Sequence, residues 1–365
     1  MQTLTVSALP GALGGHLARG LRRHAWFYGA ILLFTAAGQI VSSLYGLEDN
    51  FQVALYLENL PVVLFAFLVA FAIGHAVFVM TVKRPRRLIA HLVRDYRERF
   101  LLPERLTNGL LLIIALPIFF SVFTSFKIMI PRINPFSWDE TFALWDQALH
   151  GGIAPWELLQ PLLGFPAATV VVNFAYHLWL FVLYGLLFWQ GFSLADPRLR
   201  MQYLLATVLT WSLLGSLLAT LLSSAGPCYY HFVSEGPNPF APLMAYLQQT
   251  AETHYLPALQ VQELLWNDHQ GGGVEQARGV SAMPSMHVSS AFLFMLLGWR
   301  VHRWLGWALS SFFVMILIGS VHLGWHYAID GYLAVPLTWL IWRLAGWLVG
   351  LDPLFRQPAA SGTSG

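Results

Sequence analysis

LLLIIALPIFFSVFTSFKIMI, residues 110–130, is an apolar block with one charged side chain, Lys127. A membrane-spanning helix needs about 20 mostly apolar residues, so this block is long enough to cross a bilayer. The whole 365-residue chain has the same character: 57% of its residues are hydrophobic and 10% are charged, whereas about a quarter are charged in soluble domains. The composition therefore predicts an all-α integral membrane protein.

Polar loops separate similar apolar blocks along the chain, and their number predicts about eight transmembrane helices. We expect three regions: a two-helix hairpin with a basic segment at 1–106, a six-helix core with two long loops at 107–351, and a disordered tail at 352–365. The expected spans are 26–45, 61–82, 110–130, 168–192, 204–223, 288–301, 304–320 and 327–351.

The densest basic segment, residues 83–105, predicts the orientation. By the positive-inside rule this segment faces the cytoplasm, and counting spans then places both termini there. The long loops 131–165 and 224–284 fall on the periplasmic, lumenal or extracellular face.

A net charge of +2 gives no electrostatic case for a nucleic-acid partner. The single cysteine, Cys228, excludes an intrachain disulfide framework and a cysteine-based zinc site.

Two motifs with acid–base chemistry follow the second long loop. The first, Ser281 to His287, reads SAMPSMH and leads into the sixth span. Backbone N–H groups at that helix start, with the Ser285 hydroxyl, are suited to hold an anion, and His287 beside them is suited to act as a general acid. The second motif contains His326 and Asp330, four residues apart, so a carboxylate can orient an imidazole whose other nitrogen becomes a nucleophile.

Two further clusters lie on the same predicted face. Beyond the fifth span, Gly226 begins the sequence GPCYYH, whose Tyr229, Tyr230 and His231 are candidates to contact phosphate oxygens or a head group. At the outer end of the third span, the cations Lys127 and Arg132 are candidates to neutralise phosphoryl oxygens. For these two clusters the alternative is an ordinary interfacial role, as belt aromatics or as side chains that reach the head groups.

The order Pro-Ser-x-His followed by His-x-x-x-Asp at the start of the last span resembles the type 2 phosphatidic acid phosphatase superfamily. SAMPSMH and the upstream PFSWD at 135–139 look like its inositol phosphorylceramide synthase branch. The resemblance covers about residues 110–350 and implies a six-helix core preceded by two extra helices. It implies that His326 forms a phosphohistidine, that Asp330 orients it, and that His287 protonates the leaving group. It also implies that no metal or other cofactor takes part.

This chain departs from the usual phosphatase pattern at two places. Ser320 stands where an arginine usually precedes the nucleophilic histidine by six residues, and the segment at Gly226 replaces a lysine-rich motif that ends in Arg-Pro. Both departures match the synthase-like branch. They leave the phosphate-binding cations unassigned, so Lys127 and Arg132 are the replacements we expect, with Ser320 among the candidate phosphate-binding residues.

The expected function is lipid phosphotransfer, of a phosphoryl or phosphoinositol-type group, from a phospholipid donor to an acceptor such as ceramide or diacylglycerol. A lipid phosphate phosphatase is the alternative within the superfamily, since water then replaces the acceptor. From another class, a transporter would use Asp330, His177 and Asn173 as an ion pathway. A structural membrane subunit is a third possibility. No internal repeat is visible in the sequence, which argues against a transporter because many transporters are built from repeated halves.

Overall fold

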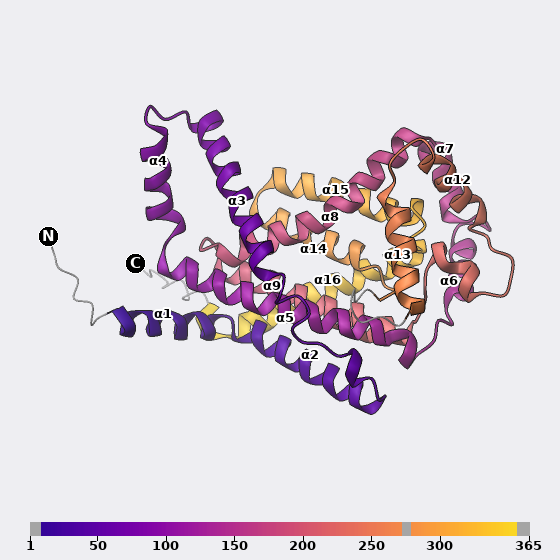
Figure 1. Ribbon diagram of the computed structural model, residues 1–365, viewed down its shortest axis with the longest axis horizontal. Coiled ribbons are helices and arrows are strands. Elements are labelled where there is room, and N and C mark those ends of the chain that lie inside the picture. Colours follow the sequence, from indigo (N-terminus) through magenta and orange to yellow (C-terminus); the bar gives the residue numbers. More distant parts are fainter. Residues whose placement is uncertain (1–8, 272–278, 356–365) are drawn as a thin grey trace, which may run out of the picture.

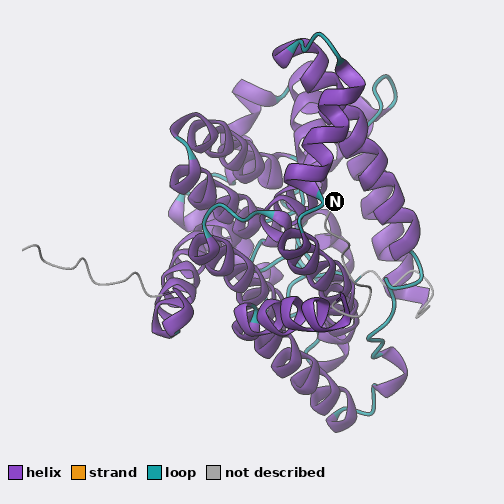
Figure 2. Cartoon of the chain, turned by 90° about the vertical axis from the view of Figure 1, so that its left-hand side faces the viewer, coloured by secondary structure: helices purple, strands orange, loops and turns teal. Residues whose placement is uncertain are grey.

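The computed structural model describes residues 9–271 and 279–355. Within these residues the regular structure is helical, and no strand occurs (Figure 2). The predicted all-α class is thereby confirmed. The helices are α1 (Leu9–Arg23), α2 (Ala25–Leu44), α3 (Leu60–Phe78), α4 (Leu88–Asp95), α5 (Pro103–Ile133), α6 (Asp139–Leu149), α7 (Pro155–Leu163), α8 (Pro166–Phe192), α9 (Pro197–Ser212), α10 (Ala219–Leu221), α11 (Tyr230–Val233), α12 (Ala241–Ala251), α13 (Pro257–Gly271), α14 (Met286–Val301), α15 (Arg303–His322) and α16 (Ala328–Leu351).

Short 3-10 or π-helical turns extend several of these helices. They are η2 (Glu48–Asn50), η3 (Val79–Lys83), η4 (Tyr96–Phe100), η5 (Leu213–Leu218), η6 (Pro227–Tyr229) and η7 (Pro353–Phe355). Phe355 in η7 is buried, so the first residues of the expected disordered tail are ordered instead. Residues 356–365, the rest of that tail, lie outside the described residues.

Seven helical stretches of the described chain are long and apolar enough to cross a membrane, which makes this a multi-pass integral membrane protein. The sixth expected span, 288–301, corresponds to α14, a shorter apolar helix of 16 residues that extends for about 24 Å. The seven are Ala25–Leu44, Leu60–Lys83, Pro103–Ile133, Pro166–Phe192, Pro197–Leu221, Arg303–His322 and Ala328–Leu351.

Helix α9 lies at the centre of the bundle. Asp196 caps its first turn by accepting the Leu199 N–H at 2.9 Å, and Pro197 occupies a first-turn position where no N–H donor is needed. Buried side chains occur all around α9, and it packs against α2, α5, α14 and α16. The π-helical turn η5 then carries the chain from α9 into α10.

The N-terminal hairpin is less enclosed than the six-helix core. None of the residues of α3 is buried, although Phe67 of this helix stacks on Phe188 of α8, and Figure 1 shows α4 standing apart from the central helices. An apolar surface of this kind is stable when lipid surrounds it. Helix α2 of the same hairpin packs against α5 and α9 instead, so the boundary near residue 106 stays a prediction.

The two long segments predicted as loops contain helices that are too short to span a membrane. Helices α6 and α7 form from the first segment, and α12 and α13 from the second. Figure 1 shows these four helices together at one end of the bundle, on the right, away from α1 and α4. They cover the end at which α14 and α16 begin.

Candidate functional site

A cavity of about 380 Å³ lies at this covered end, and we call it the histidine cavity. Helices α5, α8 and α13, the turn η5, the segment 279–287 and the turn before α16 all contribute to its lining. Both motif histidines, His287 and His326, line it, although 39 residues of sequence separate them. Lys127, from the third predicted span, lines it as well.

His326 is held by a short turn that precedes α16. The backbone N–H groups of Trp325 and His326 both donate to the Ser320 carbonyl oxygen at 3.0 Å. Gly324 takes a φ of +72°, which favours glycine, and so closes the turn after α15. The arrangement fixes the position of His326 through backbone bonds, so Ser320 contributes its carbonyl oxygen to the turn and its side chain does not line the cavity.

Asp330 orients the His326 ring as the spacing predicts. The imidazole Nδ1 lies 3.1 Å from Asp330 Oδ2, and both side chains are buried. The Tyr327 N–H also donates to Oδ2, at 3.2 Å, so the same carboxylate caps the first turn of α16. With Nδ1 engaged in this way, Nε2 is the ring nitrogen available for reaction.

Burial lowers the pKa of His326 to about 3, and the positive charge of Lys127 acts in the same direction. A backbone hydrogen bond with Ala282 opposes these two effects and raises the pKa. The imidazole is therefore neutral at neutral pH. A neutral imidazole retains the lone pair that nucleophilic attack requires.

His287 occupies the first turn of α14, where the Ser285 hydroxyl oxygen caps the helix by accepting the Val288 N–H at 3.3 Å. Two aromatic rings of α8 hold its imidazole. The ring of Tyr176 stacks at a centroid distance of 4.4 Å, and that of Trp179 lies at 4.1 Å. The centroids of the His287 and His326 rings are 6.3 Å apart, so a single phosphorus atom fits within reach of both.

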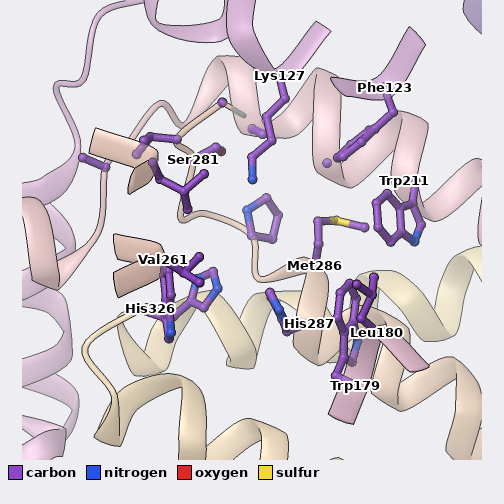
Figure 3. A pocket seen from close by; sticks show the side chains of 18 of the residues that line it. Phe123, Lys127, Trp179, Leu180, Trp211, Val261, Ser281, Met286, His287 and His326 are labelled. Carbon is purple, nitrogen blue, oxygen red and sulfur yellow. The ribbon is translucent and has the colours of Figure 1, made fainter. Parts of the chain in front are cut away.

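Lys127 completes the group of reactive side chains. Figure 3 shows it reaching from α5 toward the space in front of His287 and His326. Within residues 9–271 and 279–355, its ammonium group has no hydrogen bond or ion pair with another side chain. Gly279 lets the loop pass directly over this point, because a Cβ there would lie 2.5 Å from the Lys127 carbonyl oxygen. The loop packing thus fixes the lysine backbone beside the motif.

Arg132, the other expected cation, does not reach the histidine cavity. Its Nη1 donates to Asn50 Oδ1 at 2.7 Å, on the side of α5 that faces η2. On an α-helix two residues five positions apart are rotated by about 140°, so Lys127 and Arg132 point to different sides.

The GPCYYH cluster contributes one of its candidates to the cavity lining. Tyr229 lines it and donates its hydroxyl to the Gln262 carbonyl oxygen at 2.9 Å. Tyr230 is buried against Phe240, and His231 is exposed beside Phe232; neither lines the cavity.

Gly226 and Ser285 serve the backbone around the cavity. Gly226 has a φ of +105°, and a Cβ there would lie 2.7 Å from the Trp325 carbonyl oxygen. Only glycine fits this close approach. Ser285 is fully buried and acts as the cap of α14. Neither residue lines the histidine cavity.

Two buried aspartates that were not among the candidate site residues, Asp139 at the end of PFSWD and Asp146, tie α6 to the segments around the cavity. Asp139 accepts the N–H groups of Ala225 at 2.9 Å and Gly226 at 2.8 Å, and the Tyr327 hydroxyl at 2.7 Å. Burial raises the pKa of Asp139, while these donors oppose that shift. It therefore links the PFSWD segment to the GPCYYH cluster and to the residue after His326.

Asp146 plays a similar part at the start of α16. Its carboxylate accepts the N–H of Ala328 at 2.7 Å and that of Ile329 at 2.9 Å. These are N–H groups of the first helical turn, which lack partners within the helix. The helix end that carries Asp330 is thus anchored to α6.

In the described residues no group of three His, Cys, Asp or Glu side chains is placed to hold a metal ion.

Comparison with known proteins identifies the family. A sequence model of the PAP2 superfamily matches residues 140–344, which is more than half of the chain and includes every helix from α7 to α15. No curated protein and no solved structure matches this chain. The matched range contains both histidine motifs and the two tyrosines of GPCYYH. The chain belongs to the PAP2 superfamily, an all-α membrane fold, and this membership supports a lipid phosphatase-type function.

Proposed function

We propose that this protein is a membrane lipid phosphotransferase that works through a phosphohistidine on His326. One observation carries the proposal: the rings of His287 and His326 face one cavity at a centroid distance of 6.3 Å, and Asp330 engages Nδ1 of His326. A nucleophile, its orienting carboxylate and a candidate general acid are thereby brought together. This is the set that transfer of a phosphoryl group requires.

In the first step, Nε2 of His326 attacks the phosphorus of the donor lipid. The P–N bond forms while the bond from phosphorus to the leaving oxygen breaks, and His287, which enters this step as the imidazolium, gives its proton to that oxygen. Asp330 stabilises the positive charge that develops on the His326 ring through Nδ1–H. The products of this step are the phosphorylated enzyme and a free alcohol.

In the second step, the hydroxyl of an acceptor attacks the phosphohistidine. His287, now neutral, takes the hydroxyl proton as the new P–O bond forms and the P–N bond breaks. Both histidines return to their starting states, so atoms and protons balance over the cycle. Lys127 is suited to offset the charge on the phosphoryl oxygens in both steps, because its ammonium group points into the cavity.

The character of the cavity favours a lipid alcohol over water as the acceptor. Its lining includes Phe123, Trp211, Val261 and Leu265, and the last two belong to α13, a helix of the long segment that covers this end. An apolar, covered cavity excludes water and so suppresses hydrolysis of the intermediate. Leu180 lines the cavity and is also 44% exposed, which marks a side of the cavity next to lipid.

We accordingly propose a phospholipid donor, such as one with a phosphoinositol head group, and a lipid alcohol acceptor such as ceramide or diacylglycerol. The resemblance of SAMPSMH and PFSWD to inositol phosphorylceramide synthases supports this choice. The positive-inside pattern supports a site on the non-cytoplasmic face, with both termini cytoplasmic.

The test is a turnover assay of the purified protein without added metal. Labelled phosphatidylinositol is offered with ceramide or with diacylglycerol, and phosphatidic acid is offered separately. We expect transfer of the head group, its loss in His326→Ala, and near-normal activity in the matched variant His231→Ala, because His231 is exposed and lies outside the cavity.

Other outcomes of the assay contradict the proposal. Release of free phosphate from phosphatidic acid, without any transfer, would identify a phosphatase. Turnover that is absent, or that persists in His326→Ala, would remove the catalytic role of the histidine and favour transport.

A further inference from the structure

A second polar cavity, of about 700 Å³, lies at the opposite end of the bundle, and we call it the arginine cavity. Thirteen residues along α14 separate His287 from Arg300, and thirteen along α16 separate Asp330 from Arg343. At the rise of an α-helix each separation corresponds to about 20 Å. The two cavities are thus at opposite ends of α14 and α16.

Three arginines from three helices meet in this cavity. Arg198 comes from the first turn of α9, Arg300 from the last turn of α14, and Arg343 from the second half of α16. All three are exposed. No carboxylate in the described residues lies within ion-pairing distance of any of them. The one acidic residue in the lining, Asp196, already accepts the Leu199 N–H as a helix cap.

Close helix packing holds the arginine cavity in shape. A Cβ on Gly346 would lie 2.6 Å from Gln202 Nε2, and one on Gly350 would lie 2.9 Å from Arg198 Nη2. These two glycines therefore let the start of α9 lie directly against α16, which brings Arg198 to the cavity. Gln202 is itself fixed, because its Nε2 donates to the Trp342 carbonyl oxygen at 3.0 Å.

The chemistry of the lining matches a lipid phosphate at a membrane surface. A guanidinium group presents a planar pair of donors that fits phosphate oxygens, and three such groups exceed the single carboxylate present. Trp342 and Trp347 line the same cavity, and tryptophan is enriched at the level of the lipid head groups. Basic pockets between transmembrane helices bind anionic head groups in this way.

We propose that the arginine cavity binds the phosphate head group of an anionic phospholipid in the leaflet opposite the histidine cavity. A membrane lipid is favoured over a free anion because the tryptophans and the surrounding apolar helices place the cavity at the bilayer surface. The site is separate from the proposed catalytic residues and does not depend on their roles.

The experiment counts and titrates bound lipid by native mass spectrometry of the purified protein in detergent. The probes are phosphatidylglycerol, phosphatidylcholine and inorganic phosphate. The test variant is Arg198→Gln, Arg300→Gln and Arg343→Gln together. The matched control, Arg86→Gln, Arg87→Gln and Arg303→Gln, removes the same charge from exposed arginines that do not line the cavity.

We expect the unsubstituted protein to retain phosphatidylglycerol in preference to phosphatidylcholine. The test variant should bind one fewer phosphatidylglycerol per chain, with affinity at this site weakened about tenfold or more. The control variant and His326→Ala should keep that lipid, which distinguishes this site from binding in the histidine cavity. Arg300→Gln alone should weaken binding partially, which guards against a folding defect of the triple variant.

Three results would overturn the proposal. The first is equal retention of phosphatidylglycerol by the test variant and the unsubstituted protein. The second is equal retention of the anionic and the zwitterionic lipid. The third is displacement of the bound lipid by inorganic phosphate at matched concentration, which would point to a site for free anions.

Discussion

Replacing Asp139 by alanine should destabilise the protein strongly, because its carboxylate satisfies three buried donors. These are the N–H groups of Ala225 and Gly226 and the hydroxyl of Tyr327, at 2.9, 2.8 and 2.7 Å. Leaving a buried donor without a partner costs about 1–3 kcal/mol, so three donors together cost about 3–9 kcal/mol. The substitution also removes the free-energy cost of burying the Asp139 carboxylate, a burial that raises its pKa in the folded protein. We therefore expect the lower part of the range, about 3–5 kcal/mol.

The assay is unfolding of the purified protein in detergent, with Glu140→Ala as the matched control. Glu140 is the adjacent acidic residue and is exposed, so its removal should change stability by less than about 0.5 kcal/mol. Tyr327→Phe removes one of the three bonds and should cost about 1 kcal/mol. Combining Tyr327→Phe with Asp139→Ala should cost less than the sum of the two changes, because they share one bond.

Turnover should respond together with stability. Asp139 holds Tyr327, which directly follows His326, so the Asp139 variant should lose kcat more than it raises KM. If Asp139→Ala is no less stable than Glu140→Ala, or if its effect is additive with Tyr327→Phe, the role of Asp139 as the link among the three segments is refuted.

Three further predictions concern the cavity. Lys127→Gln should lower kcat by about a hundredfold without loss of folding stability, measured by steady-state kinetics and unfolding, and unchanged kcat would exclude a role for its charge. The imidazole of His326, observed by NMR of labelled histidine, should titrate well below the ordinary value of 6.5, and its pKa should rise in Lys127→Gln; a pKa near 6.5 would contradict its burial. Because the folded state disfavours protonation of His326, the free energy of unfolding that depends on its neutral form is fully present above pH 6.5. This contribution is lost as the pH falls toward 3. Gly226→Ala should destabilise by about 1–3 kcal/mol, since its φ is +105° and a Cβ would press on the Trp325 carbonyl oxygen; an unchanged unfolding transition would show that this turn relaxes at no cost.

The transmembrane helices could be predicted closely because hydropathy alone determines them. The first predicted span, 26–45, corresponds to α2 at Ala25–Leu44, and the last, 327–351, to α16 at Ala328–Leu351. Helix α5 extends beyond its apolar block in both directions, to Pro103 and to Ile133. A hydropathy criterion leaves the polar residues at those ends out of the predicted span, although they can still be part of the helix.

The pairing of His326 with Asp330 was also predicted from their spacing, although His326 lies in the turn before α16 and the Asp330 carboxylate reaches back to it from the first turn of that helix. The separation of Lys127 from Arg132 follows from the same geometry, since residues five apart do not share a face. Helical spacing within α5 therefore allows only one of these two cations to point toward the histidines.

The contributions of Asp139, Asp146 and Tyr176 could not be predicted from local pattern. Asp139 and Tyr327 are 188 positions apart, and Asp146 and Ala328 are 182 apart. Such contacts depend on how α6 and α8 pack against the core, and a single sequence carries no record of that packing. The short helices of the outer segments were missed for a related reason, because they lack the long apolar runs that identify spans.

Trapping the covalent intermediate tests whether His326 is the nucleophile. Purified protein is mixed briefly with a donor lipid labelled in its phosphoryl group, quenched under alkaline conditions and digested for mass spectrometry. We expect an acid-labile phosphoryl group, or phosphorylated head group, on the peptide that contains His326, and no label in His326→Ala. Label on another residue, or transfer activity that persists in His326→Ala, would contradict it.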